Sequence, residues 1–301
     1  MDHGSNTNVK ALKISAVLIF LYFIAEITVA LVTGSLSLLA DAAHELSTVV
    51  AIGVSLIAIR LTHQKPTAKH TFGFRRAETI AAFINGVLLL GMAGFIIFRG
   101  IDRLANPIEM SATPMFAMAF GGIGLEIASL FIMYKGQKNN LNIRGAFWHV
   151  MNAFLGSIAV IIAAIFITVG QIYEADTWAG LAFAIILIYA AYGIIRDSVR
   201  ILFDMTPASK DMLKIATELR AINGVSEVHH LHARTVGGGI ETFSGHLVID
   251  DVKNSSRVLQ EAKAILETKY GFTLSTIQVE DDNLEEKDPR EIEYQGKERH
   301  K

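Results

Sequence analysis

The sequence predicts a membrane protein, with an all-α bundle of six membrane-spanning helices followed by a small α+β domain. Of its 301 residues, 51% are hydrophobic, a high share for a water-soluble domain. The apolar residues are concentrated before about position 203 and the charged residues after it. After Pro207 the long apolar runs give way to short helical and alternating segments, so a second domain is expected to begin there.

Six apolar runs are each long enough to cross a bilayer, which takes roughly 20 residues. They lie at about 14–33, 35–60, 79–101, 113–134, 145–169 and 178–203. Lysines and arginines are concentrated before the first run, after the second, fourth and sixth runs, and are few in the other loops. Because cationic loops remain on the cytoplasmic side, we expect both termini in the cytoplasm.

The region after Pro207 predicts an αββαβ order. Helical periodicity covers 210–222 and 255–270, and strand-like segments cover 225–235, 241–250 and 273–280. Short connections in this order are typical of a small α+β sandwich. The expected domains are an N-terminal segment at 1–9, a membrane domain at 10–207, an α+β domain at 208–281 and a charged tail, predicted to be disordered, at 282–301.

Composition and motifs exclude several functions. A net charge of -2 gives no basic excess for nucleic acid. The chain has no cysteine, so any metal must be held by nitrogen and oxygen atoms. The pair His44-Glu45 lacks the second histidine that a zinc protease needs one turn later, and no phosphate-binding loop of the GxxxxGK[ST] type is present. We expect neither an enzyme nor an organic cofactor.

Two histidines inside the predicted spans are the leading candidates for function. Asp41, His44 and Thr48 share one stripe of the second span. A second cluster lies on the fifth span and consists of His149, Asn152 and Ala153. Ionisable groups at this depth usually face a cavity where they bind an ion or relay protons, and imidazole is a favoured zinc ligand. The alternative is that each histidine only hydrogen-bonds a neighbouring helix.

Three further carboxyl groups lie within the predicted spans, namely Glu26, Glu45 and Glu126. Glu45 points about 100° away from His44 on a helix and is the weaker candidate for binding the same ion. Glu26 and Glu126 could supply negative charge near the histidines. They could equally brace helix contacts through hydrogen bonds.

The α+β domain has a polar cluster of its own. His229 and His232 lie on one predicted strand, His246 lies on the next, and Glu280 ends the last. A sheet could bring these imidazole and carboxylate groups together as metal ligands. His230 alternates to the opposite face from His229 and is a poorer candidate. The alternative is a set of solvent-facing histidines on the open face of the sheet.

Four stretches of the sequence together resemble the cation diffusion facilitator family. They are LADAAHELSTVVAIGVSLIAIRL, KHTFGFRRAETIAAFING, NIRGAFWHVMNAFLGSIAVIIAAIF and GVSEVHHLHART, in this order. The resemblance covers about Lys10 to Glu280. It implies a homodimeric six-span exporter with a cytoplasmic ferredoxin-like domain, which exchanges zinc or another divalent metal for protons. We therefore expect an integral protein of a lipid membrane, the bacterial inner (plasma) membrane.

The resemblance also implies roles for the histidines of the spans. The zinc-transporting branch uses a His-x-x-x-Asp pair on span two and another on span five. Here His44 and His149 match, whereas Thr48 and Ala153 replace both carboxylates. Two neutral imidazoles offset little of the cost of desolvating a divalent cation. We therefore expect the ion to be held by His44 and His149 together with Asn152 or Asp41.

Two further roles follow from the same resemblance. Family positions that can bind regulatory metal at the dimer interface match His229, His232, His246 and Glu280. Arg76 and Asp204 match positions that lock the membrane domain through an ion pair, although Arg76 could also be an ordinary cytoplasmic arginine.

Three interpretations of the altered span site are open. The chain is a working exporter, or it is a non-transporting member that senses metal or stabilises an active relative. In the third, Thr48 and Ala153 are deliberate replacements that trap one state. These two residues alone do not separate the interpretations.

Overall fold

The computed structural model describes residues 3–62, 66–134 and 141–281. Within these ranges, side chains are described except at 3–16, 18, 55, 56, 58–62, 132, 133, 141–149 and 152. The chain forms two compact units, the first made of 1–59 and 81–195 and the second of 60–80 and 196–301. The predicted disorder of the tail at 282–301 falls outside the described residues.

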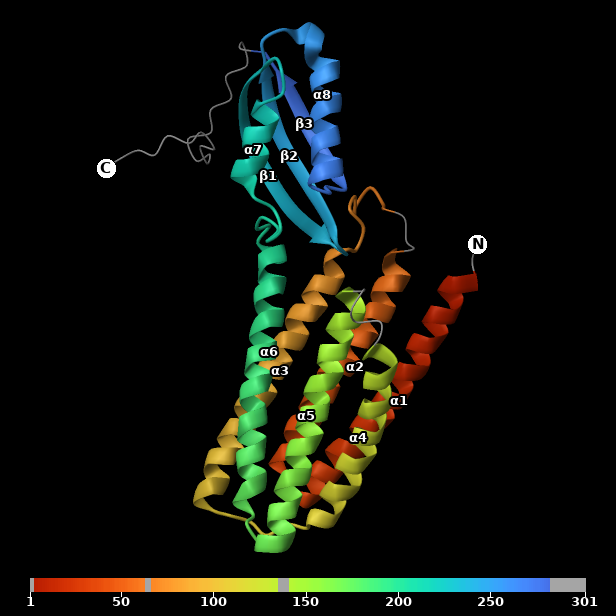
Figure 1. Ribbon diagram of the computed structural model, residues 1–301, viewed down its shortest axis with the longest axis vertical. Helices are drawn as coiled ribbons and strands as arrows, with labels where there is room; N and C mark the ends of the chain where they lie inside the picture. Colours follow the sequence, from red (N-terminus) through yellow and green to blue (C-terminus); the bar gives the residue numbers. More distant parts are fainter. Residues whose placement is uncertain (1–2, 63–65, 135–140, 282–301) are drawn as a thin grey trace, which may run out of the picture. The chain divides into compact units, whose positions relative to one another are not determined.

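In the described residues, the first unit is built from six long helices, of which α2, α3 and α6 extend into the second unit at one end (Figure 1). They are α1 (His3–Thr33), α2 (Leu36–Thr62), α3 (Arg76–Ala105), α4 (Ala112–Tyr134), α5 (Leu141–Gly170) and α6 (Glu174–Leu202). The described residues of α2 to α6 each contain an apolar stretch long enough to cross a membrane, and α1 adds a shorter one at Ile19–Thr33. The six predicted spans correspond to these six helices.

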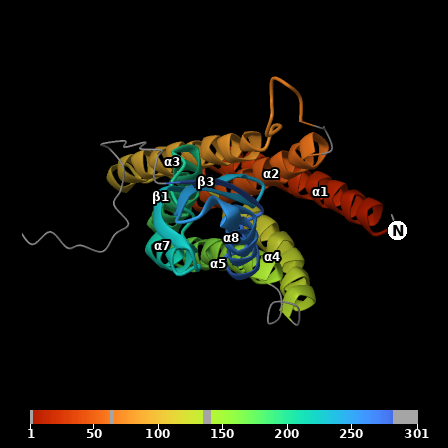
Figure 2. The ribbon, with the colours of Figure 1, turned by 90° about the horizontal axis from the view of Figure 1, so that it is seen from above.

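Small and apolar side chains bring these helices together. One buried cluster joins α1, α2, α4 and α5 around Leu38, Met115 and Val160, and a second joins α2, α3 and α6 around Ile96 and Leu187. Helices α4 and α5 lie next to each other in Figure 1 and also in Figure 2, which looks along the long axis of Figure 1. The contact between α1 and α4 places these two helices beside each other as well.

A fully buried carboxylate at the start of α6 fixes one end of the bundle. Asp176 is 0% exposed and accepts hydrogen bonds from the Ser35 hydroxyl at 2.5 Å, the Leu36 N–H at 2.7 Å and the Ser37 hydroxyl at 2.6 Å. The Arg103 guanidinium of α3 lies 3.4 Å from the same carboxylate. A negative charge at a helix N-terminus is favourable. This set of contacts, here named the Asp176 clamp, joins α2, α3 and α6.

The α+β domain forms most of the second unit. Its elements are α7 (Met212–Arg220), β1 (Val225–Gly237), β2 (Ile240–Ile249), the short turn η2 (Val252–Asn254), α8 (Ser255–Ala264) with its π-helical end η3 (Ile265–Lys269), and β3 (Leu274–Glu280). The strand order is β1-β2-β3, with β1 and β2 antiparallel and β2 and β3 parallel. The predicted αββαβ order and fold class are confirmed.

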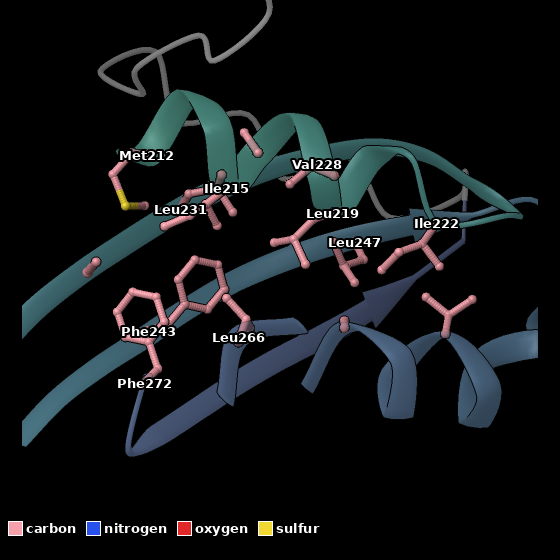
Figure 3. Close-up of a cluster of buried hydrophobic side chains, with 14 of the residues drawn as sticks. Met212, Ile215, Leu219, Ile222, Val228, Leu231, Phe243, Leu247, Leu266 and Phe272 are labelled. Carbon is pink, nitrogen blue, oxygen red and sulfur yellow. The ribbon is translucent and has the colours of Figure 1, made fainter. Parts of the chain in front are cut away.

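The core of this domain lies between its helices and one face of its sheet. Side chains from α7, the α8–η3 segment and the strands converge in a single buried cluster (Figure 3). Val228 of β1 and Leu247 of β2 belong to this cluster and are paired across the strands. Because strand side chains alternate, the next pair, His229 and His246, lies on the opposite face.

Candidate metal centres

The first candidate centre is built on α2 where it meets α5. Asp41 and His44 are 4% and 8% exposed. The Asp41 carboxyl lies beside the Ser157 hydroxyl of α5 and the Glu26 carboxyl of α1. A methyl group added to Gly156 would come within 3.1 Å of Asp41 Oδ1, so the α5 backbone approaches closely here. The polar stripe of α2 therefore faces α5.

The relative direction of α2 and α5 indicates which further residues of the two helices lie opposite each other. Helices α2 and α5 run in opposite directions, as their colours in Figure 1 show. Ala153 and Ser157 are spaced four residues apart and share one stripe of α5, and the same spacing in the sequence predicts that His149 continues it. Since Asp41 meets Ser157, residues after Asp41 on α2 lie opposite residues before Ser157 on α5. The side chains of His149 and Asn152 lie outside the described residues, so their part in the site stays a prediction.

Neither of the two altered positions offers a carboxylate. The Thr48 hydroxyl donates to the His44 carbonyl oxygen of its own helix at 3.3 Å. Ala153 is 5% exposed. The His44 ring packs against the Phe183 ring of α6, with 6.2 Å between the ring centroids. Negative charge near His44 must therefore come from other positions.

Three carboxyl groups lie close to one another in the bundle, and they are named the mid-span carboxyl cluster: Glu26, Asp41 and Glu126. Glu26 is 0% exposed, and in the described part of the chain its oxygens meet no hydrogen-bonding group other than the Asp41 carboxyl. Ser157, which lies beside Asp41, donates to Glu126 Oε1 at 3.1 Å. Unpaired negative charges at this depth are costly, so the cluster attracts protons or cations. The sequence predicted that Glu26 and Glu126 could place negative charge near the histidines, but it carried no signal that these two carboxyl groups and Asp41 meet from three helices.

The second candidate centre lies on the open face of the sheet. His229 and His246 are direct partners across β1 and β2, and one ring nitrogen from each of His229, His230 and His246 lies within 4.8 Å of the others. Glu280, which is 2% exposed, places Oε1 2.6 Å from His246 Nδ1 and Oε2 3.4 Å from His229 Nε2. Three imidazoles and one carboxylate suit a tetrahedral zinc ion. These four residues are named the histidine group.

The membership of this group differs from the sequence prediction at two positions. His230 was expected to face away, but it has a φ of 49° at an irregularity between His229 and His232. Such a bulge interrupts the alternation of side chains, and His230 joins the group. His232 was expected to contribute, but it pairs with Ser244 further along the ladder, is exposed, and lies outside the group.

The sequence also singled out Arg76 and Asp204, and the structure places them in contact. Arg76 Nη2 donates to Asp204 Oδ1, and Arg234 Nη1 of β1 lies 3.3 Å from Asp204 Oδ2. Asp204 follows the end of α6 and has a φ of 52°, a left-handed conformation that aspartate tolerates at a helix end. The Asp204 carboxylate thus forms ion pairs with two arginines, Arg76 and Arg234.

A bundle of apolar helices with buried histidine and carboxyl groups, joined to an α+β domain with a histidine group, defines a membrane transporter of cations. The comparisons with known protein families agree. Residues 12–203 match the family model of the cation efflux transmembrane domain, and residues 207–282 match that of the cation efflux protein cytoplasmic domain. The chain belongs to the cation efflux family, the cation diffusion facilitators, as its sequence motifs predicted.

Several bacterial relatives align over most of the chain. It is 36% identical to the cadmium, cobalt and zinc/H(+)-K(+) antiporter of Bacillus subtilis (strain 168), over 93% of this chain and 91% of that protein. It is 32% identical to the metal cation efflux system protein CzcD of Cupriavidus metallidurans, over 93% and 88%. It is 31% identical to the zinc transporter ZitB of Escherichia coli (strain K12), over 86% and 83%. The chain is thus an integral membrane protein of a transporter family.

Proposed function

We propose that this chain exports zinc or a related divalent cation from the cytoplasm in exchange for protons. It does so as a homodimer in the bacterial plasma membrane, with both termini in the cytoplasm. The observation that carries the proposal is the burial of Asp41 against α5 and beside Glu26, with His44 also buried on the same face of α2. The names of the relatives include zinc transport and metal/proton antiport.

The cation is bound at the level of His44, where α2 meets α5. Its ligands are His44 and His149 together with Asp41 or Asn152. Asp41 lies three residues before His44 on the same helix face and takes over the charge that Thr48 and Ala153 do not provide. Glu26 and Glu126 add negative charge nearby, which lowers the cost of bringing a divalent ion to this depth.

The same groups account for proton exchange. A proton and a metal ion compete for the same imidazole nitrogen near neutral pH. The mid-span carboxyl cluster also holds protons when no cation is present, because buried negative charge without a counter-ion is costly. Entry of the metal therefore displaces protons, and protons arriving from the opposite side displace the metal.

The cytoplasmic domain supplies regulation. A zinc ion held by the histidine group would join β1, β2 and β3 at one point, since its residues come from all three strands. Metal binding there stabilises the domain by mass action and tightens the dimer. The contacts of Asp204 with Arg76 and Arg234 brace the start of α3 against β1.

Zinc uptake into proteoliposomes with an imposed proton gradient tests the transport function. The chain as written should take up zinc, and His44→Ala should abolish uptake. A double variant, Thr48→Asp with Ala153→Asp, provides the comparison. If uptake occurs only in the double variant, the chain is a non-transporting member that senses metal or stabilises an active relative, and the proposal fails.

A further inference from the structure

A cationic cavity in the second unit has no ligand in the function proposed above, which uses only the ion pairs that Arg76 and Arg234 of its lining form with Asp204. Its volume is about 300 Å³, and it is lined by Phe72, Gly73, Arg75, Arg76, Arg234 and Val236. Three of these six residues are arginines. They come from the segment before α3 and from β1, so the cavity is formed by two distant parts of the sequence.

The arginines outnumber the carboxylates that contact them. Asp204 pairs with both Arg76 and Arg234. In the described part of the second unit, Arg75 has no ion pair of its own. Three guanidinium charges against one carboxylate leave a net charge of +2 at the cavity. Guanidinium groups bind phosphate oxygens in a planar, bidentate manner, so an anion of this kind suits the excess charge.

The wall of the cavity is fixed by a close backbone contact. A methyl group added to Gly237 would come within 2.5 Å of the Arg75 carbonyl oxygen, and Gly237 has a φ of 132°. Both the space and the conformation therefore require glycine. This contact holds the backbone of Arg75 against the turn between β1 and β2, and it positions the Arg75 side chain at the cavity.

Aromatic rings accompany the positive charges. The Arg234 guanidinium lies over the Phe72 ring, 5.9 Å from its centroid, as in a cation–π contact. Phe72 is 46% exposed and Phe74 is 42% exposed. Exposed rings beside arginines form a surface that can contact the headgroup and the adjoining hydrocarbon of a lipid at the same time.

The sequence positions of these residues put them at the membrane surface. Arg76 is the first residue of α3, and Asp204 follows the end of α6 at Leu202 by two residues. Both helices are long and apolar enough to span a bilayer. Basic pockets next to transmembrane helix ends bind anionic lipid headgroups. We propose that this cavity binds the phosphate of an anionic phospholipid headgroup, held by Arg75 and Arg234, with the Phe72 ring against its apolar part.

Native mass spectrometry of the full chain, released from detergent micelles with added lipid, tests the proposal. Phosphatidylglycerol should be retained in preference to phosphatidylcholine. Arg75→Gln and Arg234→Gln should each weaken phosphatidylglycerol binding by about fivefold, the effect of removing one cation near a membrane surface. Lys69→Gln is the matched control, because Lys69 is an exposed cation of the same loop that does not line the cavity.

Inorganic phosphate at millimolar concentration separates a lipid from a soluble anion as the source of the phosphate. Lipid retention should persist in its presence, and displacement by it would overturn the lipid assignment. Equal retention of phosphatidylcholine would also overturn the proposal, as would an equal loss in Lys69→Gln. Thermal melting establishes that each variant is folded. If Arg234→Gln unfolds because Asp204 loses a partner, Arg75→Gln still decides the outcome.

Discussion

Two buried acidic sites in the membrane bundle differ in how completely their charges are satisfied. Asp176 is 0% exposed and is surrounded by donors from α2 and by Arg103. Glu26 is also 0% exposed, yet the described residues offer its oxygens no partner other than the Asp41 carboxyl, with which it can share a hydrogen bond only when one of the two is protonated. Buried polar groups are normally satisfied. The contrast separates a carboxylate that holds the fold from carboxyl groups that are available to a cation.

The largest expected effect comes from breaking the Asp176 clamp. Asp176→Asn leaves the Arg103 charge buried without its counter-ion and should lower the free energy of unfolding by about 3–5 kcal/mol. Unfolding by sodium dodecyl sulfate titration in mixed micelles measures it. Asp197→Asn is the control, because Asp197 is 67% exposed in its pair with Arg196 and should change stability by less than about 1 kcal/mol. Equal losses in the two variants would contradict the role of the clamp.

The second prediction is that a substitution in the mid-span carboxyl cluster lowers transport without lowering stability, the reverse of the result expected at Asp176. Glu26→Gln keeps the shape of the side chain and removes an ionisable group that is costly to bury in its charged form, so the free energy of unfolding should stay the same or rise. Zinc uptake should fall by about tenfold or more, the effect of losing 1.4 kcal/mol of cation stabilisation. Glu109→Gln, at an exposed loop position, should leave both quantities unchanged. If Glu26→Gln were less stable but kept full zinc uptake, Glu26 would stabilise the fold and would not bind the cation.

The third prediction extends the comparison to the histidine group. In a His44→Ala background, which removes the membrane site, zinc at 100 times its Kd should stabilise the protein by about 2.7 kcal/mol. His230→Ala should lose most of this stabilisation, whereas His232→Ala should keep it. Melting temperatures with zinc and with a chelator measure the difference. If His232→Ala lost the stabilisation and His230→Ala kept it, His232 would be the ligand in place of His230, as regular alternation of strand side chains predicts.

The smallest effect is expected at the half-buried carboxylate of Glu218. Lys269 Nζ donates to Glu218 Oε1 at 2.7 Å, and this hydrogen bond lowers the pKa of Glu218. A lowered pKa contributes stability above the unfolded-state pKa that is lost as the pH falls through the folded-state pKa. Glu218→Gln should therefore lower the melting temperature slightly at neutral pH, and the difference should vanish in acid. A difference in melting temperature that grows as the pH falls would contradict the predicted direction of the pH dependence.

The sequence predicted those features that depend on neighbouring residues. The lengths of the apolar runs gave the six helices, and the alternation near 225–250 gave β1 and β2. The Asp176 clamp was not predicted, because Ser35 and Asp176 are 141 positions apart. The bulge at His230 was not predicted either, since one residue of left-handed backbone leaves the hydrophobic pattern on both sides intact. The domain boundaries at 10–207 and 208–281 stay predictions.

The most direct measurement of the central claim follows protons rather than zinc. Proteoliposomes that contain the purified chain and an internal pH-sensitive dye are mixed with zinc in the absence of any other gradient. If the mid-span carboxyl cluster exchanges protons for metal, zinc entry should drive proton efflux in the chain as written. The flux should disappear in Glu26→Gln and persist in Glu109→Gln. Zinc movement without proton movement, or equal proton flux in Glu26→Gln, would contradict the account.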